Sequence, residues 1–196
     1  MARLTRSWFD RDPRELAPLL LNKVLVSREG PTVLRARITE VEAYCGSTDP
    51  ASHAYRGCTP RNATMFGRPG HLYTYFVYGM HWCANVVAGA PPDDAGAVLL
   101  RAAVPIAGLD VMRARRWTGR TRESARRDID LLSGPAKLAA AFALDRTHDG
   151  LDLTRGAIGI YDDGTPPPGS PQQTVRIGLR AGRGDREPWR WLTPSV

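Results

Sequence analysis

The chain has 196 residues, the length of one domain that can bury its own core without disulfides or metals. The longest apolar run, at 138–144, is far too short to span a membrane, and no apolar segment follows the first arginines, so neither a membrane span nor a secretory signal is expected. A net charge of +7 favours a polyanionic partner such as a nucleic acid.

The first third of the chain predicts one short helix, two strands and a long loop. Asp12 is placed to cap the helix, Pro13 occupies its first position, and Glu15 can complete a capping box. Pro18 interrupts the apolar stripe that follows, so the helix is expected to be short or kinked. Strands are expected at 23–27 and 33–44, and the polar loop is expected at 46–68.

The rest of the chain predicts a hairpin, two helices and three further strands. The hairpin is rich in aromatic residues and turns at Gly79, and Ser133 is expected to cap the second helix, with Pro135 in its first turn. The strands are expected at 72–78, 81–87, 97–103, 157–161 and 174–179, the helices at 109–116 and 133–144, and a basic solvated stretch at 120–127. The segments after the Pro-rich loop at 165–169 are too small to fold alone, so one domain is expected over 1–196.

The strand at 33–44 ends in two glutamates. Residues two apart on a strand share a face, so one face is expected to hold Leu34, Ala36, Ile38, Glu40, Glu42 and Tyr44. A carboxylate at the end of a buried strand is fixed and partly desolvated, as a general base must be. The alternative is that both glutamates form surface ion pairs with the many arginines.

The hairpin at 72–87 carries aromatic residues along its strands and at its tip. Tyr73 and Tyr75 share one face, and Tyr78 lies beside the turn residue Gly79. A tyrosine at a hairpin tip is hard to bury. In a basic protein it can act as a wedge between base steps, while other aromatic side chains stack on an extruded base. The alternative is that these residues only fill the core or favour the strand.

The polar loop at 46–68 carries cations and small polar donors: Arg56, Thr59, Pro60, Arg61, Asn62 and Arg68. Such a cluster suits contacts to DNA phosphates, which position a protein without reading the sequence. An ordinary solvated loop is the alternative. For the net charge as a whole, the alternative to a nucleic-acid partner is that a GC-rich genome enriches arginine through codon usage.

The cysteines are odd in number and widely spaced, which favours a reducing, intracellular setting over a disulfide framework. No pair of them has C-x-x-C spacing, so free thiols are expected, with a metal site as the alternative. The cysteines and the histidines near them are Cys45, Cys58, Cys83, His53, His71 and His81.

A series of short motifs runs through most of the chain. In order they are Glu42-Ala43-Tyr44, His53, Thr59-Pro60-Arg61-Asn62, Met65-Phe66, Pro69-Gly70, Tyr73-x-Tyr75-x-x-Tyr78-Gly79-Met80, Cys83-x-Asn85, Val98-Leu99-Leu100-Arg101-Ala102 and Ser133-Gly134-Pro135-Ala136-Lys137-Leu138. Their order and spacing closely resemble the alkyladenine (3-methyladenine) DNA glycosylase family. The segment at 87–97 is longer than the family pattern and the loop at 53–59 slightly shorter, which bears on substrate range.

The resemblance implies an α+β fold, a single compact domain with a curved, mostly antiparallel sheet, flanking helices and a protruding, DNA-intercalating β-hairpin. It implies that Glu42 is the general base that deprotonates a water, that Arg101 helps to position that water, and that Tyr78 fills the gap left in the duplex. Contacts to the DNA backbone would come from the polar loop. The pocket around the flipped base would be formed by Tyr44, His53, Tyr75 and Asn85, the last of which would disfavour normal guanine.

The activity implied is that of a monofunctional DNA glycosylase in base excision repair. Such an enzyme flips alkylated purines from duplex DNA and hydrolyses the N-glycosidic bond, leaving an abasic site, with no metal and no organic cofactor. The partner is double-stranded DNA containing alkylated purines. The enzyme is expected to act as a monomer in the cytoplasm, associated with the nucleoid if the source is bacterial.

Two other classes of function remain open on sequence alone. A non-catalytic nucleic-acid-binding module would not need Glu42. A cation-dependent nuclease would need several clustered carboxylates, for which Glu40, Glu42 and Asp49 are a poor set. Strand cleavage through a Schiff base would need an amine of lowered pKa, for which the only lysines are Lys23 and Lys137 and the N-terminal amine is the alternative.

Overall fold

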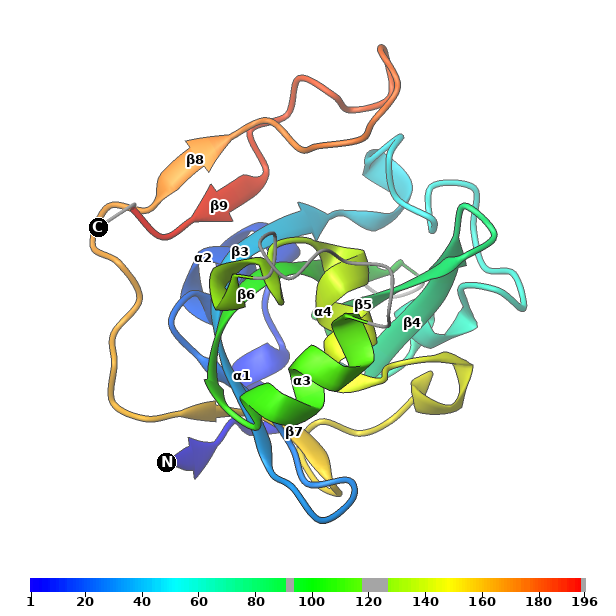
Figure 1. The fold of residues 1–196 in the computed structure, drawn as a ribbon. Helices are drawn as coiled ribbons and strands as arrows, with labels where there is room; N and C mark the ends of the chain where they lie inside the picture. Colours follow the sequence, from blue (N-terminus) through cyan, green and yellow to red (C-terminus); the bar gives the residue numbers. More distant parts are fainter. Residues whose placement is uncertain (91–93, 118–126, 195–196) are drawn as a thin grey trace.

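The computed structural model describes residues 1–90, 94–117 and 127–194, and its main feature is one curved antiparallel sheet (Figure 1). The sheet follows the order β1-β7-β2-β3-β6-β5-β4, with β9 paired to β3 and β8 paired to β9. All the strand pairs of the described ranges are antiparallel. The strands are β1 (Ala2–Arg3), β2 (Val24–Ser27), β3 (Leu34–Tyr44), β4 (Leu72–Val77), β5 (His81–Ala88), β6 (Gly96–Ala107), β7 (Ile158–Asp162), β8 (Gln172–Thr174) and β9 (Arg190–Leu192).

Short helices pack on this sheet. The helix α2 contacts β3 and β6, α4 contacts β5 and β6, and α3 contacts α4. The α-helices are α1 (Arg6–Phe9), α2 (Pro13–Leu20), α3 (Leu109–Arg116) and α4 (Pro135–Phe142), and the 3-10 turns are η1 (Gly46–Thr48), η2 (Ala63–Phe66), η4 (Asp128–Asp130) and η5 (Arg146–His148). None of the described helices is long and apolar enough to cross a membrane. One antiparallel sheet with segregated helices confirms the α+β prediction.

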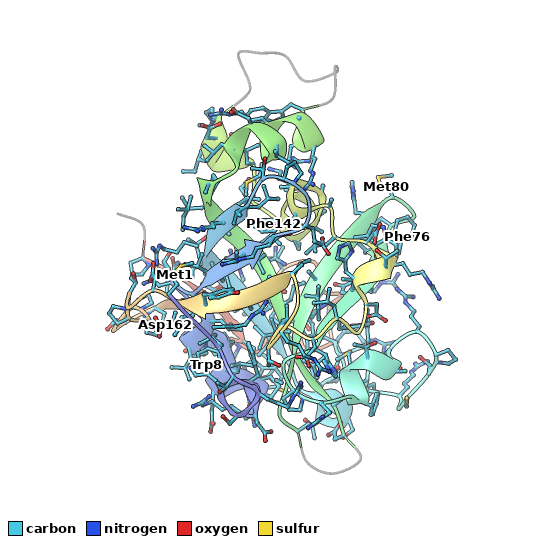
Figure 2. All side chains as sticks on the ribbon, turned by 90° about the horizontal axis from the view of Figure 1, so that it is seen from below. Met1, Trp8, Phe76, Met80, Phe142 and Asp162 are labelled. Atoms are coloured by element: carbon cyan, nitrogen blue, oxygen red, sulfur yellow. The ribbon has the colours of Figure 1, made fainter. Side chains whose placement is uncertain are left out.

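The main core lies between one face of the sheet and these helices. Leu16 and Leu20 of α2 are fully buried there, as are Leu138 and Phe142 of α4, and Figure 2 shows Phe142 inside the molecule. A second, smaller cluster, made of Ala54, Met65, Tyr73, Val87, Ala95 and Ala97, separates the opposite face of β4, β5 and β6 from the polar loop after β3. That second face is where the pocket described below is built.

The strand β3 changes the face that it presents to the core partway along its length. Its pairing with β6 is irregular on both sides of Glu40. The core residues before this point are Leu34, Ala36 and Ile38, and those after it are Val41 and Ala43. A bulge adds one residue and reverses the alternation, so Glu42 and Tyr44 lie on the face opposite to the earlier apolar residues. The prediction that all six residues share one face is therefore wrong.

The helix caps agree with the sequence in part. Asp12 caps α2 by accepting a hydrogen bond from the Arg14 N–H at 2.8 Å, and it also pairs with the Arg14 guanidinium. The capping box expected with Glu15 is not among the hydrogen bonds of the described residues. The helix is short, as predicted. The cap of α4 is Gly134, not Ser133 as predicted, and the Ser133 hydroxyl accepts a hydrogen bond from Lys137 Nζ at 2.8 Å instead.

The C-terminal part differs most from the sequence prediction. The prediction of a strand at 174–179 is wrong, because β8 ends at Thr174 and an irregular loop then runs to β9. The strand expected at 157–161 is confirmed as β7. The very short elements β1, α1 and β9 were not predicted, since they are too short to show a period. Most of the basic stretch expected at 120–127 lies outside the described residues.

Candidate active site

A cavity of about 280 Å³ opens between the β4–β5 hairpin, the loop after β3 and the loop between β8 and β9. In Figure 1 these loops lie on the same side of the molecule, next to the free end of the hairpin. The volume is close to the lower limit of about 300 Å³ for small-molecule sites. Much of the wall is aromatic, with contributions from Tyr44, His53, Tyr73, Tyr75 and Tyr78.

Strand alternation explains which hairpin residues reach the cavity. From β4, Tyr73, Tyr75 and Val77 line it, and from β5, Cys83 and Asn85 do. Each of these residues is two apart from the next on its strand, so all project from one face of the sheet. The sequence pattern of the hairpin therefore predicted a shared aromatic face correctly.

Glu42 lies directly behind the cavity wall and is fully buried, with 0% of its surface exposed. Its Oε2 accepts a hydrogen bond from the Tyr44 hydroxyl at 2.9 Å, and its Oε1 accepts one from the Ile177 N–H at 2.8 Å. Arg101 Nη1 lies 3.2 Å from the same Oε1. All three neighbours line the cavity, so Glu42 is separated from it by the groups that hold its oxygens. Both oxygens act only as acceptors here, as in a carboxylate.

Arg101 connects the two glutamates of β3. Its Nε donates to Glu40 Oε1 at 2.7 Å, and Arg190 of β9 donates to the same oxygen at 2.6 Å. Burial opposes the charge on Arg101, but Glu42 and Glu40 outweigh it and raise the pKa of the guanidinium. The glutamates do pair with arginines, as the alternative prediction held, but the pairs lie largely buried beside the cavity rather than on the surface.

The aromatic wall is closely connected and uncharged near neutral pH. His53 Nδ1 lies 2.9 Å from the Tyr73 hydroxyl, and the His53 ring meets the Tyr75 ring edge to face at 4.5 Å between centroids. Burial and the nearby Arg61 lower the pKa of His53, and burial raises the pKa of Tyr73 to about 12. A neutral histidine and neutral tyrosines do not repel a cationic ligand.

Asn85 is buried in the wall of the cavity, at 3% exposure. Its Nδ2 donates a hydrogen bond of 3.2 Å to the Tyr73 carbonyl across the hairpin. That contact fixes which way the side-chain amide points, because only the NH₂ group can donate. A fixed polar group among aromatic walls can select between bases that differ in their hydrogen-bonding groups.

The hairpin tip presents Tyr78 to solvent. This side chain is 79% exposed, and the neighbouring Met80 is 68% exposed. Figure 2 shows Met80 and Phe76 at the outer end of the hairpin, far from the core residue Phe142. Tyr78 has a positive φ of 54° and is followed by Gly79 at 67°. Positive φ is uncommon for a bulky side chain, and such strain is concentrated at functional positions.

The polar loop divides into one structural residue and several exposed ones. Asn62 is 2% exposed, and its side chain holds the loop together by accepting from Thr59 and donating to the carbonyls of His53 and Gly57. Its amide is therefore occupied inside the loop. Arg61 donates to the Phe76 carbonyl at 3.2 Å, which ties the loop to the hairpin. The exposed residues of the predicted set are Arg56, Thr59, Arg61 and Arg68.

Two parts of the site had no signal in the sequence. The backbone of Ile177, which holds Glu42, lies in a segment that was predicted as a strand. Arg176 beside it is fully buried against Asp49, whereas arginine is almost always exposed.

The three cysteines are not clustered: Cys58 is exposed and Cys83 is buried in the cavity wall. Among the described residues, no group of three His, Cys, Asp or Glu is placed to hold a metal ion.

The site thus combines a buried carboxylate, held in place by its neighbours, with a largely aromatic cavity next to it. Comparison with known proteins gives the family. The chain matches the family model of Methylpurine-DNA glycosylase over residues 7–195. It belongs to the methylpurine-DNA glycosylase family, and it is a DNA glycosylase, a hydrolase of alkylation-damage repair.

Curated relatives cover nearly the whole chain and carry the name "Putative 3-methyladenine DNA glycosylase". One from Burkholderia cenocepacia is 51% identical over 193 residues, which is 97% of this chain and 87% of its own length. One from Streptomyces avermitilis is 47% identical over 193 residues, 96% of this chain and 87% of its own length. One from Carboxydothermus hydrogenoformans is 45% identical over 181 residues, 92% of this chain and 90% of its own length.

Proposed function

We propose that the protein flips 3-methyladenine and related alkylated purines out of duplex DNA and hydrolyses the N-glycosidic bond with water alone. The product is an abasic site in an intact strand. The observation that carries this proposal is Glu42, whose two hydrogen-bond donors and one ion-pair partner all line an aromatic cavity. The test is release of free base from duplexes that each contain one alkylated purine, in the presence of a chelator.

The chemistry follows from charge. As the bond to the base breaks, positive charge develops on the sugar, and a nearby carboxylate stabilises it. Water forms the new bond to the sugar carbon, its proton passes to Glu42, and the alkylated base takes the bonding electrons and leaves as a neutral molecule. Of the three contacts to Glu42, the one from Arg101 is longest, so we expect water to enter there and Arg101 to orient it.

The cavity suits a cationic purine. Purines alkylated on a ring nitrogen, such as 3-methyladenine in DNA, carry positive charge, and stacking a cation on aromatic faces contributes about 0.5–2 kcal/mol. In this proposal Tyr44, His53 and Tyr75 form the walls, and the neutral state of His53 removes a competing charge. Asn85, a polar side chain fixed in the cavity wall, disfavours normal guanine, which carries an exocyclic amine. Flipping itself costs a few kcal/mol, and least for damaged bases.

Replacing Tyr78 by alanine is expected to weaken lesion binding and slow base release while leaving the fold intact, because the exposed ring would no longer fill the gap in the duplex. Fluorescence of a base analogue opposite or beside the lesion measures flipping. Tyr78→Phe keeps the flat ring and is expected to flip normally. Unchanged flipping in the alanine variant would make Tyr78 only structural.

Lesion binding is expected to weaken steeply as salt rises, because exposed arginines of the polar loop would contact phosphates. Replacing Arg56, Arg61 and Arg68 together by glutamine should reduce the log–log salt slope by about 0.9 for each phosphate that the variant no longer neutralises. The control is Arg28→Gln, an exposed arginine whose guanidinium lies over Tyr161 of β7. An equal log–log salt slope in the triple variant and in the control would contradict the proposal that the polar loop contacts phosphates.

The enzyme is expected to stop at the abasic site, because no amine of the described residues lines the cavity. Lys23 is buried against Asp162 at 2.9 Å, and neither it nor Lys137 lines the cavity. The N-terminal amine is held away by the pairing of β1 with β7, and Figure 2 shows Met1 beside Asp162, across the molecule from the hairpin tip. Borohydride is expected to trap no protein–DNA adduct. An adduct that disappears in Lys23→Ala or Lys137→Ala would overturn the monofunctional proposal.

We also propose that the enzyme acts as a monomer in the cytoplasm, on the DNA of the nucleoid, and without a metal. The support is that one chain supplies the carboxylate, the cavity and the wedge. Full base release in chelator would separate this proposal from a cation-dependent reaction.

A further inference from the structure

Arg176 is the most completely enclosed cation of the described residues. Both it and Asp49 have side chains that are 0% exposed, and they form a two-pronged ion pair with distances of 2.6 and 2.8 Å. Arg176 also donates to the carbonyls of Ala43, on β3, and Gly184, in its own loop. Gly184 has a positive φ, and a Cβ there would lie 2.6 Å from the guanidinium, so the close approach requires glycine.

The guanidinium is also flanked by two aromatic rings. Its central carbon lies 4.7 Å from the ring centroid of Tyr44 and 4.9 Å from that of Trp189. Tyr44 is both a wall of the cavity and the donor to Glu42 Oε2. The position of the Tyr44 ring, and with it one hydrogen bond of Glu42, therefore depends on the Arg176 side chain.

The Glu42 carboxylate also depends on Arg176 through the backbone of the next residue. Ile177, the next residue, donates its N–H to Glu42 Oε1 at 2.8 Å, and Ile177 also lines the cavity. The loop between β8 and β9 has no regular structure at this point, so no ladder of backbone hydrogen bonds fixes it. Arg176 supplies the fixed point by joining this loop to Asp49 and to the Ala43 carbonyl beside Glu42.

We infer that Arg176, held by Asp49, is a positioning residue for base release: it orients the Glu42 carboxylate through Tyr44 and Ile177. The inference rests on the proposed function of Glu42. The pair contributes little net charge, since the carboxylate of Asp49 offsets the guanidinium. Its role is geometric, and misplacement of reacting groups by about 1 Å costs on the order of a hundredfold in rate.

The experiment compares variants of Arg176 and Trp189 with a remote control. Arg176→Lys keeps the charge but cannot form the two-pronged, stacked arrangement. Trp189→Leu keeps every ion pair and removes one face of the stack, so it is the variant that tests the idea even if a change at Arg176 prevents folding. The control is Arg6→Lys, which weakens the ion pair of Arg6 with Asp152 (2.6 Å), neither of which lines the cavity.

Three quantities are measured on each folded variant: the thermal midpoint, the dissociation constant for a duplex with a stable abasic-site analogue, and the single-turnover rate of 3-methyladenine release. We expect Arg176→Lys to slow release about 10- to 100-fold and Trp189→Leu to slow it less, while binding changes less than about threefold. Arg6→Lys should lower the midpoint but leave the rate unchanged. A purely structural role of Arg176 would instead lower the midpoint alone.

If Arg176→Lys folds, a release rate within about twofold of the native value would overturn the inference. If Arg176→Lys does not fold, the same result in Trp189→Leu would overturn it. Glu42→Gln, run in the same assay, separates this failure from failure of the proposed function. If Glu42→Gln is inactive and the Arg176 and Trp189 variants are fully active, only the positioning role is refuted. If Glu42→Gln is itself active, the general-base proposal fails and the positioning inference falls with it.

Discussion

Replacing Glu42 by glutamine is expected to reduce the rate of base release on the order of a hundredfold or more. Glutamine has nearly the same shape, but it lacks the charge that stabilises the developing positive sugar and the basicity that removes the proton from water. Binding to lesion-containing DNA should be largely retained, because Glu42 lies behind the cavity wall rather than in it. Single-turnover release of 3-methyladenine measures the first effect, and gel-shift titration measures the second.

Glu40→Gln is the matched control for this experiment. Glu40 lies on the same strand and pairs with both Arg101 and Arg190, but it makes no contact with Tyr44 or Ile177 in the structure. We expect a much smaller loss of rate in this variant. Near-normal turnover in Glu42→Gln, or an equal loss in both variants, would contradict the assignment of Glu42 as the base.

Replacing Arg101 by methionine is expected to lower the free energy of unfolding by about 3–5 kcal/mol, which is the usual cost of leaving one member of a buried ion pair without its partner. Arg101 is 12% exposed, and Glu42, which it faces, is 0% exposed. Total stabilities of domains are about 5–15 kcal/mol, so this single change removes a large fraction. Urea denaturation at pH 7 measures it.

A second substitution tests the physical reason. Adding Glu42→Gln to Arg101→Met removes the unpaired charge, and we expect it to restore at least half of the missing stability. The comparison pair is Arg37 with Asp163, at 2.7 Å but more exposed, where Arg37→Met should cost less than about 1 kcal/mol. Equal costs at the two arginines would show that the ion pairs around Glu42 have no special contribution to stability.

The sequence by itself determined most of the regular elements, and it singled out several of the residues that line the cavity. The strands β4, β5 and β6 were predicted from short aromatic or apolar runs and are present in the structure, and Asp12 and Pro13 mark the start of α2 without any tertiary information. The shared face of Tyr73 and Tyr75 also follows from local geometry, because residues two apart on a strand point the same way. The order of the motifs was sufficient to predict the family, which the comparisons confirm.

Tertiary structure alone decided where Glu42 lies. A bulge beside Glu40 moved Glu42 to the face opposite the one predicted, and no local pattern marks that extra residue. The groups that hold Glu42 come from residues far apart in the sequence: Arg101 on β6 and Ile177 in the last loop. Arg176 was expected in a strand, yet it is buried against Asp49. Periodicity reports only which face a residue shares with its neighbours, whereas burial of a charge depends on a partner that folding alone brings into contact.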